Sequence, residues 1–269
     1  MTSRTDLSIG NIHPEVGNWQ RFLNEQGMTD ALGKPLVADE HFGARTLFAT
    51  KLWQRLQHLP ETGAVDRVTR KLAVDAGFIG FLPAKFYGQH WPKPRHIRLI
   101  VIHTAECAEV PEAAESVASY FTNPQRRNPQ TGALEPVIAS AHYTVDENSV
   151  MQSVRDEDVA WHASNVNDYS LGIEHAGRAR QTQAEWFDSA SRAILARSAK
   201  LVASLMRRYN LGHDTVRVLA TPEEIREGTA RGLCGHVDVT RAFGTRGGHV
   251  DPGPHFPWLH YLALVKASL

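Results

Sequence analysis

The sequence of 269 residues contains two cysteines, Cys107 and Cys234, which is too few for a disulfide framework. No apolar run reaches the length of a membrane-spanning helix, and the first residues, Met1–Leu7, lack the apolar core of a secretory signal. Lysine plus arginine equals aspartate plus glutamate, at 29 each, so no excess of positive charge favours nucleic acid or an anionic membrane as a partner. We therefore expect a globular protein made in the cytoplasm without a signal peptide, with no nucleic acid partner and no membrane insertion.

Histidine, by contrast, is abundant, with 14 residues. His103 closes the β-type run Arg98–Thr104, and a buried strand presents such a side chain at its carboxyl end. Two further histidines have similar neighbours. They are His236, in the segment Cys234–Asp238, and His249, in the segment Gly247–Gly253; each follows a glycine and stands two residues before an aspartate. A strand-end histidine, a histidine after a glycine and a loop carboxylate make a His/His/Asp set. Three such ligands leave a fourth position open, as in catalytic zinc sites.

From residue 97 onward, short apolar runs of strand type alternate with helical patterns. The expected strands cover residues 98–103, 142–146, 150–154 and 171–174. The expected helices cover residues 111–121, 184–209 and 258–266, and Thr221–Glu224 has the sequence of a capping box that starts another helix. This alternation predicts an α/β domain with a central mixed β-sheet flanked by helices.

The first 80 residues carry a different pattern. Asp39–Thr46 and Glu61–Thr69 each combine a glycine turn with a threonine ahead of a helical pattern, and Val16–Leu23 has apolar residues at helical spacing. Three short helices joined by glycine turns predict a small all-α domain. Prolines and aromatic residues between 81 and 96 indicate a linker. We therefore expect a helical domain over residues 1–80, a linker over 81–96 and the α/β domain over 97–269.

Residues 12–78 resemble the peptidoglycan-binding domain found at the ends of many bacterial and phage wall hydrolases. The resemblance rests on four short segments, Trp19–Leu23, Phe42–Thr46, Leu52–Gln54 and Gly63–Thr69. One departure is Glu40, where that family usually has a glycine. The resemblance implies that peptidoglycan is the partner of this domain, which would keep the protein at a high local concentration on the polymer.

Residues 97–257 resemble the zinc-dependent N-acetylmuramoyl-L-alanine amidases, a family that shares its fold with peptidoglycan recognition proteins and phage lysozyme-type amidases. The matching motifs are Val101–Thr104, Ser140–Asp146, Val159–Ala163, Asn167–Glu174, Gly235–Asp238 and Asp251–Pro254, in the family's order. Several short motifs in order are far more specific than any one of them. The resemblance implies the fold of that family and one bound zinc ion.

The same resemblance implies that His103, His236 and Asp251 bind the zinc ion. Glu174, at the end of an apolar strand, would be the general base that accepts a proton from zinc-bound water. Its pKa would be set by burial, which raises it, and by the cation, which lowers it. The alternatives are structural: a histidine bonded to the backbone, an aspartate in a turn before proline, and a glutamate in a salt bridge.

His249 departs from the family pattern, because many relatives have lysine two residues before the aspartate ligand. Residues two apart in an extended segment face the same side, so His249 would still face the site and could donate a hydrogen bond to the oxyanion. A second possibility is that His249, and not Asp251, is the third metal ligand.

His142, Trp161 and His162 match family positions that line the substrate groove. For these three, core packing and hydrogen bonding are the alternatives to substrate contact. Asp238 either orients a metal ligand or has a plain role in a turn. His175 follows Glu174 on the strand and should face the other way.

The resemblance implies hydrolysis of the amide between the lactyl group of N-acetylmuramic acid and L-alanine in peptidoglycan. We expect a monomeric phage endolysin that reaches the cell wall after release from the cytoplasm and lyses the host. A secreted antibacterial amidase and a wall-recycling amidase are alternatives. A non-catalytic peptidoglycan recognition protein is another, although the ligand set and Glu174 are complete here. A zinc peptidase is disfavoured because the sequence has no His-Glu-x-x-His motif.

Overall fold

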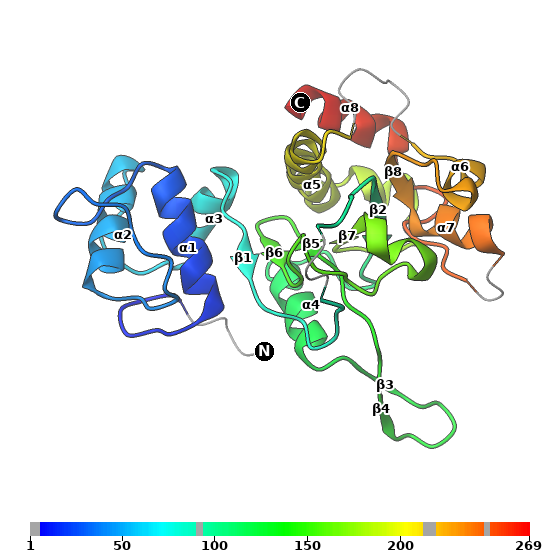
Figure 1. The fold of residues 1–269 in the computed structure, drawn as a ribbon, viewed down its shortest axis with the longest axis horizontal. Coiled ribbons are helices and arrows are strands. Elements are labelled where there is room, and N and C mark those ends of the chain that lie inside the picture. Colours follow the sequence, from blue (N-terminus) through cyan, green and yellow to red (C-terminus); the bar gives the residue numbers. More distant parts are fainter. Residues whose placement is uncertain (1–5, 90–93, 212–218, 245–247) are drawn as a thin grey trace. The chain divides into compact units, whose positions relative to one another are not determined.

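The computed structural model describes residues 6–89, 94–211, 219–244 and 248–269 (Figure 1). The chain forms two compact units. One comprises Met1–Leu82 with Ser149–Met151, and the other comprises Pro83–Asn148 with Gln152–Leu269. The expected linker over residues 81–96 lies partly outside the described residues. No helix in the described ranges is long and apolar enough to cross a membrane.

The first unit contains three helices, α1 (Pro14–Glu25), α2 (Ala44–Leu56) and α3 (Arg67–Asp75). Their core is aromatic: Trp19 lies 5.1 Å from Phe78 and 5.7 Å from Trp53 between ring centroids, in edge-on contacts that favour burial of large rings.

The two repeated threonines of this unit do not precede their helices as predicted. Thr46 and Thr69 each lie in the first helical turn and are buried. The side-chain amides of Gln20 and Gln54 donate hydrogen bonds of 3.0 Å to Thr46 and Thr69 respectively. The repeat is therefore a pair of buried polar contacts between successive helices.

The second unit is built on parallel strands. β5 (Tyr143–Val145), β7 (Ser170–His175), β2 (Leu99–Thr104) and β8 (Gly232–Gly235) lie side by side in that order, and each neighbouring pair is parallel. All six residues of β2 are buried, as expected for a strand covered on both faces. Apart from these four strands, β1 (Gly80–Phe81) and β6 (Val150–Gln152) are hydrogen-bonded to each other. The predicted α/β architecture is confirmed.

Helices enclose this sheet (Figure 1). They are α4 (Ala113–Thr122), α5 (Ser189–Arg208), α6 (Pro222–Glu227), α7 (His236–Phe243) and α8 (Trp258–Ser268), with 3₁₀ turns η1 (Ser164–Tyr169) and η2 (Glu185–Phe187). The capping box at Thr221 is confirmed. Cys234 is fully buried among the apolar residues between the sheet and α7, which supports a packing role for this thiol.

The long helix predicted over residues 184–209 is divided. Thr182 and Glu185 form reciprocal hydrogen bonds, which enclose only the short turn η2. The helix α5 starts at Ser189, because the side chain of Asp188 accepts a hydrogen bond from the backbone N–H of Ser191.

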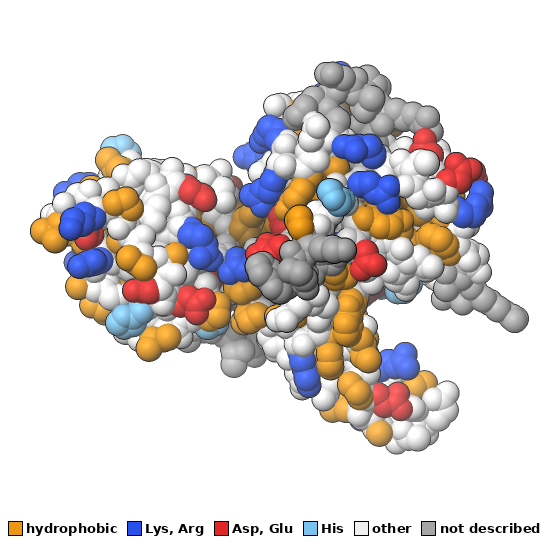
Figure 2. All heavy atoms as spheres, viewed as in Figure 1, with side chains coloured by type: hydrophobic (Ala, Val, Ile, Leu, Met, Phe, Trp, Pro, Cys, Tyr) orange, Lys and Arg blue, Asp and Glu red, His pale blue; other side chains and the backbone are white. Residues whose placement is uncertain are grey.

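A hairpin of β3 (Gln125–Arg127) and β4 (Leu134–Pro136) projects from the second unit and was not predicted (Figure 1). Figure 2 shows hydrophobic side chains along this projection. Leu134 and Ile138 are 59% and 66% exposed, so apolar surface borders the site described below.

Candidate metal and catalytic site

The parallel sheet brings the predicted site residues to one edge. In the pairing of β2 with β7, His103 is opposite Glu174, so both side chains emerge at the carboxyl ends of their strands. β8 lies on the other side of β2 and runs directly into α7, whose first residue is His236. Asp251 reaches the same place from a loop, with its backbone oxygen accepting a hydrogen bond from the N–H of Val237.

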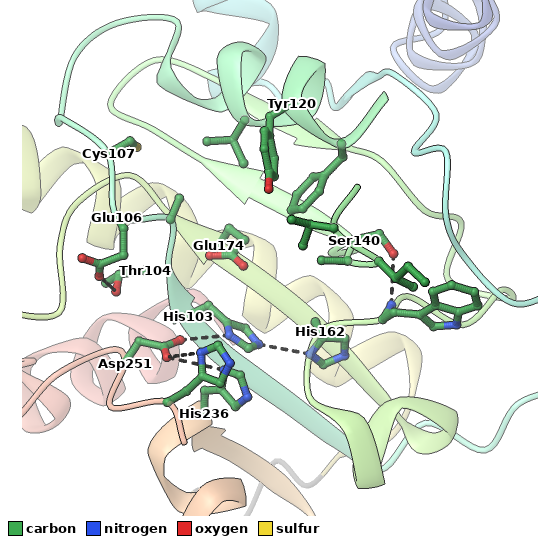
Figure 3. A pocket seen from close by; sticks show the side chains of 18 of the residues that line it. His103, Thr104, Glu106, Cys107, Tyr120, Ser140, His162, Glu174, His236 and Asp251 are labelled. Atoms are coloured by element: carbon green, nitrogen blue, oxygen red, sulfur yellow. Dashed lines mark hydrogen bonds and ion pairs between the residues drawn. The ribbon is translucent and has the colours of Figure 1, made fainter. Parts of the chain in front are cut away.

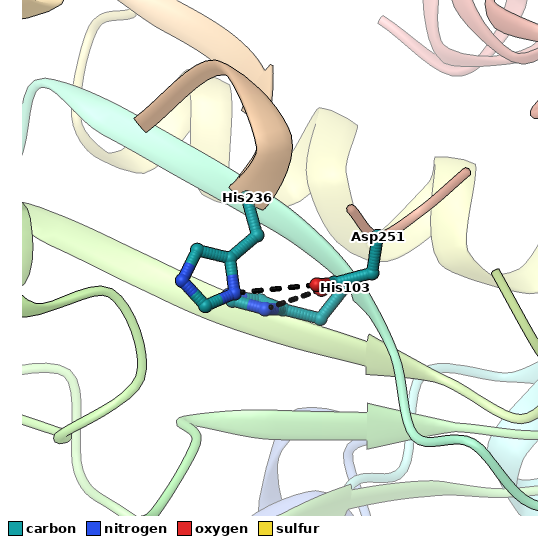
Figure 4. A group of neighbouring side chains, drawn as sticks. All are labelled: His103, His236 and Asp251. Atoms are coloured by element: carbon teal, nitrogen blue, oxygen red, sulfur yellow. Dashed lines mark hydrogen bonds and ion pairs between the residues drawn. The ribbon is translucent and has the colours of Figure 1, made fainter. Parts of the chain in front are cut away.

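His103, His236 and Asp251 form one buried cluster (Figure 4). The Nδ1 atom of His103 lies 3.0 Å from one carboxylate oxygen of Asp251, and the Nδ1 atom of His236 lies 3.4 Å from the other. Two ligands bound tetrahedrally at zinc distances would stand about 3.3 Å apart. His236 Nδ1 is also buried without a hydrogen-bond partner. The three residues therefore fit a zinc ion.

The charges of the cluster also suit a cation. Burial opposes the charge of Asp251, but the imidazoles of His103, His236 and His249, whose Nδ1 atoms lie 3.0, 3.4 and 3.5 Å from its carboxylate oxygens, hold its pKa well below the usual range. Burial lowers the pKa of His236 to about 4, so this imidazole is neutral at physiological pH. Burial also disfavours the charge of His103, yet Glu174 and Asp251 raise its pKa. The carboxylate of Asp251 and the neutral imidazole of His236 are therefore in the forms that bind metal.

Glu174 has the environment expected for a proton acceptor. Its pKa is raised to about 7, mainly by burial; the charges of Asp251 and Glu106 also raise it, while His103 and His249 lower it. Its Oε2 atom is buried without a hydrogen-bond partner. A carboxyl group that is poised near neutral pH and has a free oxygen can accept and return a proton.

These groups line one cavity of about 850 Å³ (Figure 3). Tyr120 of α4 lies on one side, and Arg126 and Ile138, at the base of the hairpin, also line it. Trp161 is part of the wall, with its ring stacked on Phe86 at 6.4 Å between centroids. The cavity is large enough for a sugar or a short peptide next to the cluster.

Two of the predicted substrate residues, Trp161 and His162, line this cavity, but His142 does not. The side chain of His142 is fully buried, and its Nδ1 accepts a hydrogen bond from the N–H of Gly172. Burial, followed by the nearby Arg95, lowers its pKa to about 3. This placement corrects the prediction of substrate contact for His142 and favours the alternative, a neutral histidine of the core.

His249 lies at the edge of the cluster, as its spacing predicted. Its ring stacks on His236 at 3.9 Å between centroids, and its Nδ1 lies 3.5 Å from Asp251. It is 67% exposed, unlike the buried set of His103, His236 and Asp251. The geometry therefore favours Asp251 over His249 as the third ligand.

Two neighbours of the cluster have structural roles. Asp238 accepts a hydrogen bond of 2.9 Å from the N–H of Gly235, which fixes the start of α7. This contact supports the turn role for Asp238. His175 is fully buried, and its ring packs edge-on against Phe256 and Tyr261. It therefore faces away from Glu174, as predicted.

The sequence did not indicate the role of Arg95. Its buried guanidinium donates hydrogen bonds to the carbonyl oxygens of Asp156, Asn167, Asp168 and Ser170, which ties the start of β7 to the loops around it. Arg95 lies in a proline-rich stretch that has the composition of a linker. No local sequence pattern distinguishes a buried arginine in such a stretch from an arginine on the surface.

Comparisons with known proteins point to one family. A profile of the family described as N-acetylmuramoyl-L-alanine amidase matches residues 93–254. N-acetylmuramoyl-L-alanine amidase A of Achromobacter lyticus is 30% identical over 180 residues, which is 63% of this chain and 83% of that protein. The 1,6-anhydro-N-acetylmuramyl-L-alanine amidase AmpD of Haemophilus influenzae is 25% identical, over 65% of this chain and 86% of that protein.

Among solved structures, a selenomethionine derivative of AmpD aligns with a TM-score of 0.49 and 21% identity, covering 70% of this chain and 94% of that one. The family match spans more than half of the chain and includes every residue of the candidate site. The chain therefore belongs to the N-acetylmuramoyl-L-alanine amidase family.

Proposed function

We propose that this protein is a zinc-dependent peptidoglycan amidase. The observation that carries the proposal is the buried cluster of His103, His236 and Asp251 beside the unpartnered carboxylate of Glu174. The bond cleaved would be the amide that joins the lactyl group of N-acetylmuramic acid to L-alanine. Both curated relatives named above are amidases of muramyl-L-alanine bonds, which supports this choice of bond.

His103, His236 and Asp251 would hold the metal. A zinc ion in that place supplies a Lewis acid that polarises the scissile carbonyl and lowers the pKa of water. Glu174 takes the proton from the attacking water at Oε2, while the water oxygen adds to the carbonyl carbon. The same carboxyl then returns the proton to the alanine nitrogen as the carbon–nitrogen bond breaks. The products are the lactyl carboxylate and the free amino group of the peptide.

His249 would assist at the oxyanion. Its exposed ring borders the cavity next to Asp251, within reach of a substrate that occupies the space in front of the cluster. An N–H donor held there would stabilise the negative charge that develops on the carbonyl oxygen. Trp161, on the wall of the same cavity, offers a flat apolar surface for a sugar or peptide face.

The first unit would bind the wall. Its three helices carry the segments that resemble peptidoglycan-binding domains, and binding there would raise the local concentration of the amidase on its polymer. A wall-binding unit joined to an amidase suits lysis of a host by a phage endolysin, which we propose as the biological role. The enzyme would then act on the wall after its release from the cytoplasm.

Wall recycling is the second candidate role, because AmpD is named for a 1,6-anhydro-muramyl substrate. Intact sacculi and soluble 1,6-anhydro-muropeptides separate the two roles. An endolysin should release peptides from intact sacculi at least as fast as from the soluble compounds. A strong preference for the soluble compounds would reject the lytic role and support recycling.

Digestion of purified peptidoglycan tests the chemistry. New amino-terminal alanine without new reducing sugars is the expected result, and Glu174→Gln should abolish it. New amino termini of another residue would show that the enzyme is a peptidase. Binding to the insoluble wall without release of either group would show a recognition protein.

A further inference from the structure

We propose that His162 is a positioning residue, which fixes the nitrogen that His103 presents to the metal and is itself held by Ser170. The proposal rests on the metal site of the proposed function. It gives His162 the role of orienting the proposed metal ligand His103, in addition to its place on the cavity wall.

The two nitrogens of His103 have different partners (Figure 3). Nδ1 faces Asp251 at 3.0 Å, on the side of the proposed ion, and Nε2 lies 3.1 Å from Nδ1 of His162. The contacts continue away from the cluster, because Nε2 of His162 lies 3.1 Å from the hydroxyl of Ser170. A ligand, a second histidine and a buried serine thus form one chain of hydrogen bonds.

The positions of the protons follow from this order. A neutral imidazole has one N–H donor and one acceptor nitrogen. If Nδ1 of His103 binds the metal, its proton must be on Nε2, which donates to Nδ1 of His162. His162 then carries its own proton on Nε2 and donates it to Ser170. With neutral rings, this is the pair of tautomers that satisfies both contacts and leaves the ligand nitrogen free.

The surrounding backbone is shaped to hold the His162 ring. A Cβ atom added at Gly172 would lie 2.6 Å from Cγ of His162, so the ring occupies space that the side chain of any other amino acid at position 172 would fill. The N–H groups of His162 and Ala163 both donate to the side-chain oxygen of Asn167, at 3.2 and 2.8 Å. The close approach of Gly172, the backbone contacts to Asn167 and the hydroxyl of Ser170 together therefore fix the His162 ring without a contribution from substrate.

Three substitutions at residue 162 test the proposal through the affinity for zinc, measured by competition with a chromophoric chelator. In His162→Asn the side-chain oxygen can take the place of Nδ1 and accept from His103. In His162→Gln the oxygen reaches toward the place of Nε2, and in His162→Leu there is no acceptor. We expect His162→Gln and His162→Leu to bind zinc about 10- to 100-fold more weakly, and His162→Asn to stay close to the wild type. Equal affinities for His162→Asn and His162→Leu would overturn the proposal.

The wild-type protein allows a second measurement that does not depend on how the variants fold. Nitrogen-15 NMR of the zinc-loaded protein should show a proton on Nε2 of His103 and a scalar coupling across the hydrogen bond to Nδ1 of His162. An Nε2 atom without a proton, or no coupling, would overturn the proposal. Failure of the wild type to bind zinc would reject the metal site and this inference together. Zinc binding that all three variants retain would reject this inference alone.

Discussion

His103 and Glu174 are paired in register on adjacent parallel strands, so a candidate metal ligand and a carboxylate lie next to each other at one edge of the sheet. Neither depends on a flexible loop for its position, because both strands are buried and hydrogen-bonded along their length. This arrangement separates two roles that can be tested independently, because the carboxylate of Glu174 is not part of the His103, His236 and Asp251 cluster.

Substitution Glu174→Gln should therefore remove catalysis and leave metal binding in place. We expect the rate of alanine release from peptidoglycan to fall by about 10²- to 10⁴-fold, the usual contribution of a general base. Zinc affinity should stay within a few-fold of the wild type. The exposed Glu157 provides the matched control, as Glu157→Gln makes the same change in charge away from the cavity. A Glu174→Gln variant with wild-type rates would remove Glu174 from the mechanism.

Removal of metal should lower both activity and thermal stability. Zinc that binds only the folded protein stabilises it by about 2.7 kcal/mol when its free concentration is 100 times the dissociation constant. For a unit of this size we expect a rise of roughly 5–10 °C in the melting temperature of the second unit. Calorimetry with and without a chelator measures the shift. It should vanish in Asp251→Asn and persist in Glu174→Gln, and a shift of equal size in Asp251→Asn would contradict the ligand assignment.

The two glutamine contacts of the first unit predict a stabilising substitution. The N–H groups of Glu40 and Gly63 donate to the side chains of Gln20 and Gln54 in equivalent places, and both residues have positive φ, at 64° and 74°. This left-handed conformation costs a residue other than glycine about 1–2 kcal/mol. Part of the gain on removing the side chain is lost to the greater freedom of glycine in the unfolded chain.

We therefore expect Glu40→Gly to raise the stability of the first unit by about 0.5–1 kcal/mol. Hydrogen exchange of the amides in α1, α2 and α3 reports this unit without interference from the second. Glu40→Ala is the control, because it removes the carboxylate and keeps the strained Cβ. If Glu40→Ala stabilises the unit as much as Glu40→Gly, the carboxylate and not the backbone is responsible.

Local patterns revealed some parts of this protein and not others. The apolar run that ends at His103 and the strand that carries Glu174 near its end were predictable, because a buried parallel strand has a continuous run of apolar residues in the sequence. The role of Arg95 was not, because its partners are backbone carbonyls more than 60 positions away. The burial of His142 also depends on tertiary packing, which separates it from the neighbouring His162 although both fit a groove motif.

The burial of His142 gives a prediction for the stability of the fold at acid pH. Its pKa is about 3 in the folded protein and about 6.5 in an unfolded chain, so between these values the unfolded state binds more protons. The free energy of unfolding must then fall as the pH falls below about 6.5, by up to about 1.4 kcal/mol per pH unit from this residue. Above that pH the residue contributes no pH dependence.

His142→Asn isolates this effect, since asparagine can accept the hydrogen bond from Gly172 and cannot be protonated. Denaturant unfolding of both metal-free proteins at pH 7.5, 6.5, 6 and 5 gives the difference in their free energies of unfolding. We expect the wild type to lose stability relative to His142→Asn as the pH falls from 6 to 5, with little change between 7.5 and 6.5. A difference that stays constant over the whole range would show that His142 is protonated as easily in the folded protein as in the unfolded chain. The guanidinium of Arg95 opposes that outcome, because it lies within 2.9 Å of the ring and repels a second positive charge.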